Sequence, residues 1–191
     1  MNDLQVTVDG MSHPLRTPFM VIATQNPLEF TGTYPLPESQ LDRFLMKIQV
    51  GYPSHDQERR ILAERKANDP VEGLSPVLTS AEVDQLAERV KAVRVDQAIV
   101  DYMLSLVEKT RQDAALVAGV SPRGGIFLYR ATQALAYVEG REYAVPDDVK
   151  TLAVPVLAHR VIERSRRSLM DGRAGALGVV QRVLEQVPAP Q

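Results

Sequence analysis

Three residues of this chain have types and positions suited to phosphate chemistry. Asn26 follows an apolar run, and its amide can both donate and accept hydrogen bonds to a water or a phosphate. Arg43 lies in Leu41-Asp-Arg-Phe44, and a guanidinium can stabilise the charge of a transferring phosphoryl group. Arg123 lies in Ser121-Pro-Arg, a sequence typical of a helix start, where anions bind readily. The residue types predict contacts with phosphate.

Each of these residues also has an interpretation that needs no ligand. Asn26 could cap its own turn, and Arg43 could pair with Asp42 or Glu38. Arg123 could be a solvated arginine that bridges to an acid on another helix. A cation in the first helical turn is disfavoured by up to about 1 kcal/mol, and an anion beside it removes this cost. Arg123 is therefore the most suggestive of the three.

The remaining charges and the composition narrow the function classes. The run His159 to Arg167 is basic but lacks aromatic residues, so we interpret it as a solvated helix end, with a weak patch for nucleic acid or an acidic partner as the alternative. The 191 residues carry a net charge of −2, are 45% apolar and include no cysteine. This excludes disulfides, thiolate catalysis and cysteine metal sites, and the three scattered histidines do not indicate a metal site.

The length fits one large or two small domains. No apolar run approaches the roughly 20 residues of a membrane helix. The residues after Met1 lack a basic region followed by an apolar core, so we expect no signal peptide and a cytoplasmic protein.

Residues 1–53 are predicted to form an α/β piece. Residues 5–8 and 13–17 should pair as a hairpin around Asp9-Gly10. Residues 19–23 form a continuous apolar run, typical of a strand buried on both faces, and residues 44–50 alternate as a second strand. One helical turn is expected at residues 38–42. Two strands and a hairpin cannot make a stable covered sheet, so we expect the missing strands before Met1.

Residues 54–191 are predicted to be all-α. Capping residues mark the helix starts; they are Ser54, Thr79, Asp96, Ser121 and Pro146. Apolar residues recur at helical spacing, as in Ile99, Met103 and Val107 and in Val83, Leu86 and Val90. The helix after Ser121 is apolar on most sides and should end at Gly140. Pro155 should kink or split the helix after Pro146.

At these residues the chain resembles the MoxR family of AAA+ ATPases. The resemblance covers about residues 4–164 and rests on a combination of short stretches. They are Gln5-Val-Thr-Val-Asp-Gly10, Pro18 to Pro27, Gly32-Thr-Tyr-Pro-Leu-Pro-Glu38, Gln40-Leu-Asp-Arg-Phe44, Gly51-Tyr-Pro53, Ser121-Pro-Arg123, Val138-Glu-Gly-Arg141, Pro146-Asp-Asp-Val-Lys150 and Val154 to Arg160. The implied fold is the C-terminal part of a P-loop NTPase core at residues 1–53, followed by a helical lid at residues 54–191.

The resemblance implies catalytic and ATP-binding roles for three positions. Asn26 matches sensor 1, which positions the attacking water or contacts the γ-phosphate. Arg43 matches the arginine finger that reaches the nucleotide of the neighbouring subunit, and Arg123 matches sensor 2 on the lid. The family uses ATP and Mg²⁺, forms rings that are usually hexamers, and acts as chaperone-like remodellers beside proteins with von Willebrand factor A domains.

The chain departs from the family pattern at the nucleotide cradle. The phosphate loop G-x-x-x-x-G-K-[ST] occurs nowhere in the sequence, and the Walker B acids are absent too. We therefore expect a fragment of a MoxR-type ATPase that alone is inactive and binds neither ATP nor Mg²⁺ tightly. The alternatives are a regulatory module that joins a ring of full-length subunits, or a piece of a helicase- or chelatase-related motor. Nucleic acid and a membrane are not expected as partners.

Overall fold

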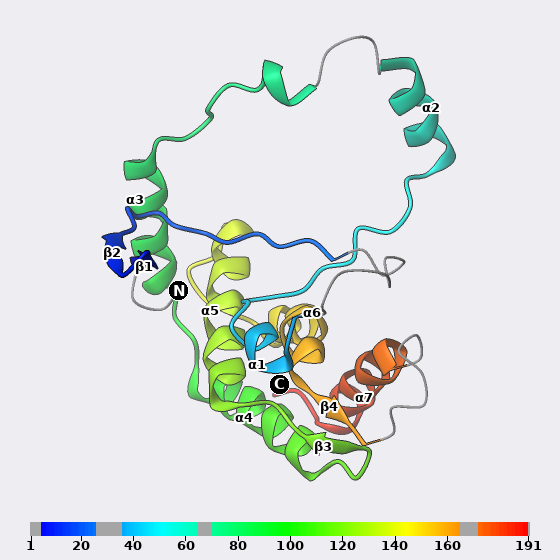
Figure 1. Cartoon of the computed structure of the whole chain (residues 1–191). Coiled ribbons are helices and arrows are strands. Elements are labelled where there is room, and N and C mark those ends of the chain that lie inside the picture. The colour runs from blue at the N-terminus through cyan, green and yellow to red at the C-terminus, as the bar shows by residue number, and fades with distance from the viewer. Residues whose placement is uncertain (1–4, 26–35, 65–69, 165–171, 191) are drawn as a thin grey trace. The chain divides into compact units, whose positions relative to one another are not determined.

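The computed structural model describes residues 5–25, 36–64, 70–164 and 172–190 (Figure 1). Contacts divide the chain into two units, and each is described by itself. The first holds Met1–Thr24 and Gln49–Ala87, and the second holds Gln25–Ile48 and Glu88–Gln191. This division follows contacts, whereas the boundary expected near residue 53 follows the change of sequence pattern, so that boundary stays a prediction.

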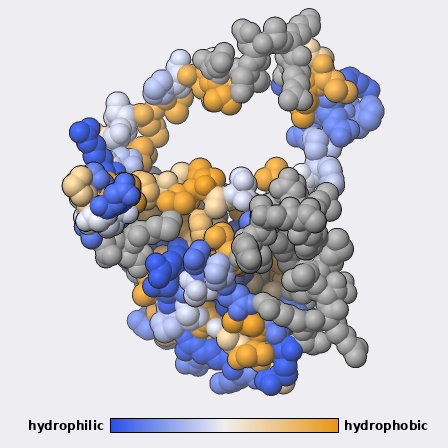
Figure 2. Space-filling model, viewed as in Figure 1, coloured by the Kyte–Doolittle hydropathy of each residue, from blue (hydrophilic) through white to orange (hydrophobic). Residues whose placement is uncertain are grey.

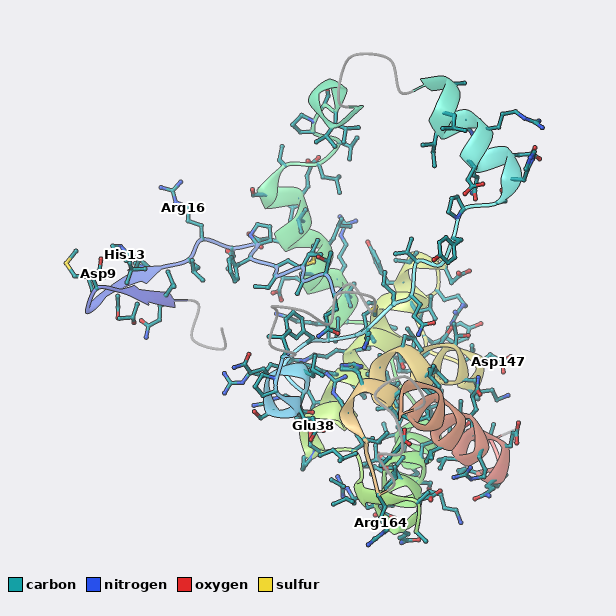
Figure 3. All side chains as sticks on the ribbon, turned by 45° about the vertical axis from the view of Figure 1, so that its right-hand side comes forward. Asp9, His13, Arg16, Glu38, Asp147 and Arg164 are labelled. Carbon is teal, nitrogen blue, oxygen red and sulfur yellow. The ribbon has the colours of Figure 1, made fainter. Side chains whose placement is uncertain are left out.

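The first unit begins with a hairpin at the predicted turn, and its antiparallel strands are β1 (Gln5–Val8) and β2 (Met11–Pro14). The returning strand therefore begins earlier than the predicted residues 13–17, directly after the turn. Val6 lies opposite His13 in the ladder. Asp9 and Gly10 have positive φ angles of 49° and 81°, as a two-residue turn of type I′ requires. Figure 3 shows Asp9 near the tip and His13 on the returning strand. The strand residues are exposed, so turn chemistry and ladder bonds define this element.

The helices of the first unit are α2 (His55–Glu64), η1 (Pro70–Gly73) and α3 (Ser80–Lys91), whose last residues belong to the second unit. Ser54 and Thr79 cap α2 and α3 as predicted, each through a reciprocal pair of bonds known as a capping box. Ser54 N donates to Gln57 Oε1 at 2.8 Å, and Thr79 N donates to Glu82 Oε2 at 2.7 Å. The bonds from Thr79 lower the pKa of the Glu82 carboxyl.

Apolar side chains lie open between η1 and α3, where Figure 2 shows orange patches along the extended segment. Leu74 is 77% exposed and Val77 is 93% exposed. The predicted α3 stripe of Val83, Leu86 and Val90 is half-buried, and α3 buries no residue fully. The apolar residues of this unit therefore form no closed core among the described residues.

The two strands expected at residues 19–23 and 44–50 are absent from the described structure, which corrects the sequence prediction. Both segments are outside regular structure, and the described sheets are only the pair β1–β2 and the pair of β3 (Leu116–Ala118) with β4 (Ile162–Glu163). Ile22 is 79% exposed and Val50 is 92% exposed. An apolar run becomes a strand only when its N–H and C=O groups find a ladder partner, and none is present in the described ranges.

The second unit packs helices around an apolar core. Its elements are α1 (Glu38–Leu41), α4 (Gln97–Gln112), β3 (Leu116–Ala118), α5 (Pro122–Val138), α6 (Pro146–Leu157), η2 (Ala158–Arg160), β4 (Ile162–Glu163) and α7 (Gly172–Gln186). α4 buries the predicted residues Ile99, Met103 and Val107. The core continues through Leu106, Leu128, Val149, Val156, Val180 and Val183. No helix in the described ranges is both long and apolar enough to cross a membrane.

The helix starts of this unit follow the sequence closely. Asp96 accepts from Ala98 N at 3.0 Å at the start of α4. Val145, a residue without a capping group, precedes α6; Asp148 takes over by accepting from Val145 N at 2.9 Å. α6 is not split, because it runs through Pro155 to Leu157. α5 is less buried than predicted, since Ile126 is 54% and Val138 is 79% exposed.

Candidate functional site

The second unit brings two of the three predicted site residues into one region. Arg43 follows α1, and Arg123 lies in the first turn of α5. Figure 3 marks α1 by Glu38. Asn26 lies outside the described residues, so its position stays a prediction. The region is built from α1, the extended residues after it, the start of α5 and η2.

The start of α5 is fixed from behind by α4. Val120 N donates to the buried Thr110 Oγ1 at 3.0 Å, and Arg111 Nε donates to Val120 O at 2.9 Å. A Cβ on Gly119 would lie 2.6 Å from the Arg111 backbone, so only glycine allows this close approach. The residue before the helix cap is therefore bonded through both its backbone groups.

Ser121 caps α5 as predicted and also contacts α1. Its Oγ accepts from Gly124 N at 3.4 Å and donates to Asp42 Oδ1 at 3.0 Å. Arg123 Nη1 donates to Asp42 Oδ2 at 3.1 Å. Asp42 therefore supplies the negative charge that a cation at a helix start requires. The ligand-free interpretation of Arg123, a bridge to an acid of another element, describes this state.

Arg160 is the largest correction to the sequence analysis, which placed it in a solvated helix end. Its side chain is 0% exposed, with Nε 3.3 Å from Asp42 Oδ1. Nη2 donates to Asp42 O at 3.3 Å and to Phe44 O, and Nη1 donates to Leu45 O at 3.3 Å and to Val156 O. One guanidinium therefore bonds to three backbone carbonyls within residues 42–45, directly after α1.

Two further contacts keep Arg160 in place. Its guanidinium lies 4.9 Å from the centre of the Phe127 ring, a cation–π distance. Burial, followed by the charge of Arg123, lowers the pKa of Arg160 to about 10, while Asp42 opposes this shift. Arg160 thus stays charged at neutral pH, and its burial is compensated by the carbonyls and carboxylate around it.

Gly124 makes room for this arginine. A Cβ at this position would lie 2.4 Å from Val120 Cγ1 and 2.9 Å from Arg160 Cδ. Gly125, the next residue, has only an ordinary contact of 3.9 Å to Val107. Glycine costs about 1 kcal/mol in a helix relative to alanine, and at Gly124 the close packing of Arg160 explains why alanine does not fit.

His159 is a second titratable group of this region that sequence reasoning missed. Arg160 Nη1 donates to His159 Nε2 at 2.6 Å, and since an arginine has no acceptor, the imidazole must be neutral. Burial and the Arg160 charge lower the pKa of His159 to about 4. His13 and His55 are exposed. Among the described residues no three acids, histidines or cysteines gather to hold a metal.

Arg43 differs from its neighbours because it is exposed. Its backbone N donates to Gln40 O at 3.1 Å. The pairing with Asp42 that sequence reasoning allowed is not seen, since that carboxylate contacts Ser121 and Arg123. Across the described ranges the Arg43 guanidinium makes no hydrogen bond or ion pair. A cation presented on a fixed backbone is available to an anion outside this region.

One sequence signal could have found Arg160. Along α6 and η2 the buried positions are Val149, Leu152, Ala153, Val156, Leu157 and Arg160. This spacing continues the apolar face of the helix onto the arginine. The ion pair of Asp42 with Arg123 had no such signal, because the two residues are 81 positions apart.

Comparison with known proteins gives two family matches. Residues 1–46 match the ATPase family associated with various cellular activities (AAA), and residues 108–176 match the AAA lid domain. The chain is 42% identical over 190 residues to the uncharacterized protein YeaC of Bacillus subtilis, and the match covers 100% of this chain and 59% of YeaC. It is 37% identical over 200 residues to the chaperone MoxR1 of Mycobacterium tuberculosis, covering 100% of this chain and 52% of MoxR1.

More distant relatives widen the comparison. The chain is 30% identical over 164 residues to the magnesium-chelatase subunit ChlI-1 of Arabidopsis thaliana, covering 85% of this chain and 37% of that subunit. A crystal structure of a protein from Cytophaga hutchinsonii, assigned as an ATPase, has a TM-score of 0.83 at 29% identity and covers 100% of this chain and 60% of that one. The chain thus spans between about half and three-fifths of the length of YeaC, MoxR1 and the solved structure.

Proposed function

Because this chain belongs to the MoxR family of AAA+ ATPases, we propose that it supplies the arginine finger and the lid arginine of an ATP-hydrolysing assembly. The predicted fold class, an AAA+ core followed by a helical lid, is confirmed by the family matches and the solved structure. The short strand pair β3–β4 departs from the prediction that residues 54–191 are all-α. The family uses ATP and Mg²⁺. The whole assembly would use hydrolysis to remodel protein partners, in keeping with the chaperone name of MoxR1.

Each site residue has a proposed role. Arg43 would reach the phosphates of a nucleotide on a neighbouring subunit, and Arg123 would contact the γ-phosphate from the lid. Asn26 would orient the attacking water. When bound, ATP supplies the phosphoryl group that is transferred to water. This chain's arginines would stabilise the negative charge on that group, a task that needs fixed cations rather than proton transfer.

The residues in the described ranges fit the phosphates better than the metal. Arg123 is 39% exposed, lies in the first turn of a helix and contacts a carboxylate, a group with acceptor geometry close to that of a phosphate. No cluster of metal-binding residues is found in the described part. We therefore propose that Mg²⁺ and the phosphate cradle belong to residues other than those described, in a longer product of which this chain is a fragment.

The observation that carries this proposal is the contrast between the two arginines. Arg43 is exposed and without a side-chain partner in the described ranges, while its backbone follows Asp42, which Arg160 and Arg123 hold. An arginine finger that acts on another subunit needs an available side chain on a backbone that is held in place. The proposed assembly is a ring, with six subunits as the expected size and proteins with von Willebrand factor A domains as expected partners.

A mixing experiment tests the finger role. A full-length family member is prepared in which the arginine corresponding to Arg43 is replaced by alanine, and this chain is added in excess. Arginine fingers contribute about 10³ to 10⁵ in rate, so we expect a rise of at least about tenfold in Mg²⁺-dependent ATP hydrolysis. The Arg43→Ala chain should give no rise, and the Arg59→Ala chain, which loses an exposed arginine of α2, should match the wild type.

The outcomes separate the alternatives. Turnover by this chain alone that survives both Arg43→Ala and Arg123→Ala would contradict the proposal. A change in the partner's rate that does not depend on Arg43 would favour a regulatory module over a finger. Salt-sensitive DNA binding lost on Arg164→Ala would instead favour a nucleic-acid motor, in which released counterions dominate the affinity.

A further inference from the structure

Asp42 lies where the segment that carries Arg43 meets the first turn of α5, which carries Arg123. Its Oδ1 lies 3.0 Å from Ser121 Oγ and 3.3 Å from Arg160 Nε, and its Oδ2 lies 3.1 Å from Arg123 Nη1. Asp42 immediately precedes Arg43 in the chain. A single carboxylate therefore connects the backbone that carries Arg43 to the guanidinium of Arg123.

The two arginines that contact Asp42 are held very differently. The Arg160 side chain is 0% exposed and also donates to the carbonyls of Phe44 and Leu45. The Arg123 side chain is 39% exposed, and its only side-chain bond in the described ranges is the one to Asp42. When another anion competes, Arg123 can leave, whereas Arg160 keeps Asp42 and its backbone in place.

A phosphate is a suitable competitor for this bond. Phosphate and carboxylate accept the same pair of N–H groups from a guanidinium. The exchange needs no new protein charge to be buried, since Asp42 keeps Ser121 and Arg160 as partners. The cost of releasing Arg123 is that of one partly exposed ion pair, which is small.

We propose that Asp42 is a positioning residue that holds Arg123 beside the Arg43 segment and releases it to a phosphate group. Binding of phosphate by Arg123 would then relieve one of the contacts that fix the segment carrying Arg43, which couples the two arginines. This inference rests on the proposed phosphate contact of Arg123 and adds the residue that competes for it.

The test measures binding of inorganic tripolyphosphate and of ATP to the full chain by calorimetry. Asp42→Asn keeps the shape and the bond to Ser121 but removes the competing charge. We expect it to tighten tripolyphosphate binding about threefold, the size typical of a partly exposed ion pair. Asp147→Asn, which removes an exposed charge on α6, is the matched control and should leave the affinity unchanged. ATP should behave as tripolyphosphate does if the phosphates alone are recognised.

A second measurement needs no variant at Asp42. The side-chain carboxyl carbon resonance of Asp42 in the wild-type chain should shift as tripolyphosphate is added, because the carboxylate loses Arg123. Arg123→Ala should weaken binding at least about tenfold and leave this resonance unchanged on titration. Thermal unfolding of each variant shows whether it is folded.

The results separate this inference from the proposed function. If Arg123→Ala loses binding but Asp42→Asn binds equally or more weakly, and the Asp42 resonance does not move, the coupling is wrong while the phosphate role of Arg123 stands. If Arg123→Ala binds as the wild type does, or if neither wild type nor Asp42→Asn binds either anion, both ideas are wrong. An equal gain from Asp147→Asn would reduce the effect to net charge and also overturn the coupling.

Discussion

Two segments of the chain are both predicted as strands but have different surroundings. Residues 19–23 are a continuous apolar run and residues 44–50 alternate, and neither segment forms a strand in the described structure. After α1, however, the chain has partners within its unit: Arg160 donates to the carbonyls of Asp42, Phe44 and Leu45, and Lys47 N donates to Pro155 O at 2.8 Å.

The segment at residues 19–23 has no such bonds in the described part of its unit. Its neighbour Thr17 donates to Asp84 at a long 3.4 Å, while Met20 is 77% exposed. An apolar sequence alone is therefore not enough to hold a segment in place. Side chains that hydrogen-bond to the backbone of a segment can hold it in place without a sheet.

The largest effect should come from removing the side chain that orders the second segment. Arg160→Ala removes a buried cation that pairs with Asp42 and bonds to four backbone carbonyls, and breaking a buried pair costs about 3 kcal/mol or more. Urea unfolding of the chain measures this loss. Arg130→Ala, an exposed arginine on α5, should change stability by less than about 0.5 kcal/mol. Equal losses from both variants would show that Arg160 does not order the segment.

A smaller effect is expected from Gly124→Ala. The added methyl would meet Val120 Cγ1 and Arg160 Cδ, and overpacking of this kind costs about 1–3 kcal/mol. Gly125→Ala has room and should be neutral or stabilising by up to about 1 kcal/mol, because alanine favours the helix. Thermal unfolding of the two neighbouring variants is the comparison. A stabilising Gly124→Ala would contradict the close approach of Arg160.

Acid should weaken the same region. The pKa of His159 is about 4 in the folded chain against 6.5 for the free group. Between these values the unfolded chain binds more protons, so the free energy of unfolding falls as pH falls from about 6.5 to about 4. Burial is incomplete, so we expect a loss on the order of 1 kcal/mol. His159→Gln should flatten the dependence in this window, and an unchanged slope would exclude His159 as its source.

The smallest effect is expected from a substitution within residues 19–23. Ile22 is 79% exposed, so Ile22→Ala should change the free energy of unfolding by less than about 0.5 kcal/mol. Ile99, which is 6% exposed in α4, gives the matched variant, and Ile99→Ala should cost about 2–5 kcal/mol. Similar losses at both positions would mean that residues 19–23 are buried when the chain folds.

The features that the sequence predicts correctly are those that depend on neighbouring residues. The hairpin turn at Asp9-Gly10 and the caps at Ser54, Thr79 and Ser121 need only neighbouring residues, and all are confirmed. The helical faces of α4 follow from spacing alone.

Features that depend on contacts between distant residues were not predicted from the sequence. Strands depend on a partner segment, so residues 19–23 could not be judged from their own composition. Arg160 was read as solvated because charge usually indicates exposure, although its spacing from Val156 indicated the buried face. The contact of Asp42 with Arg123 depends on tertiary packing across 81 positions. The proposed roles of Asn26, Arg43 and Arg123 stay predictions.

Amide hydrogen exchange of the whole chain, read residue by residue, tests the central contrast most directly. We expect protection at Phe44 and Lys47, whose N–H groups donate to Leu41 O and Pro155 O, and rapid exchange at Met20, Val21 and Ile22. Arg160→Ala should remove the protection at Lys47 while sparing the core of α4. Protection at residues 20–22 equal to that at Lys47, or no protection at Lys47 in the wild type, would contradict the contrast between the two segments.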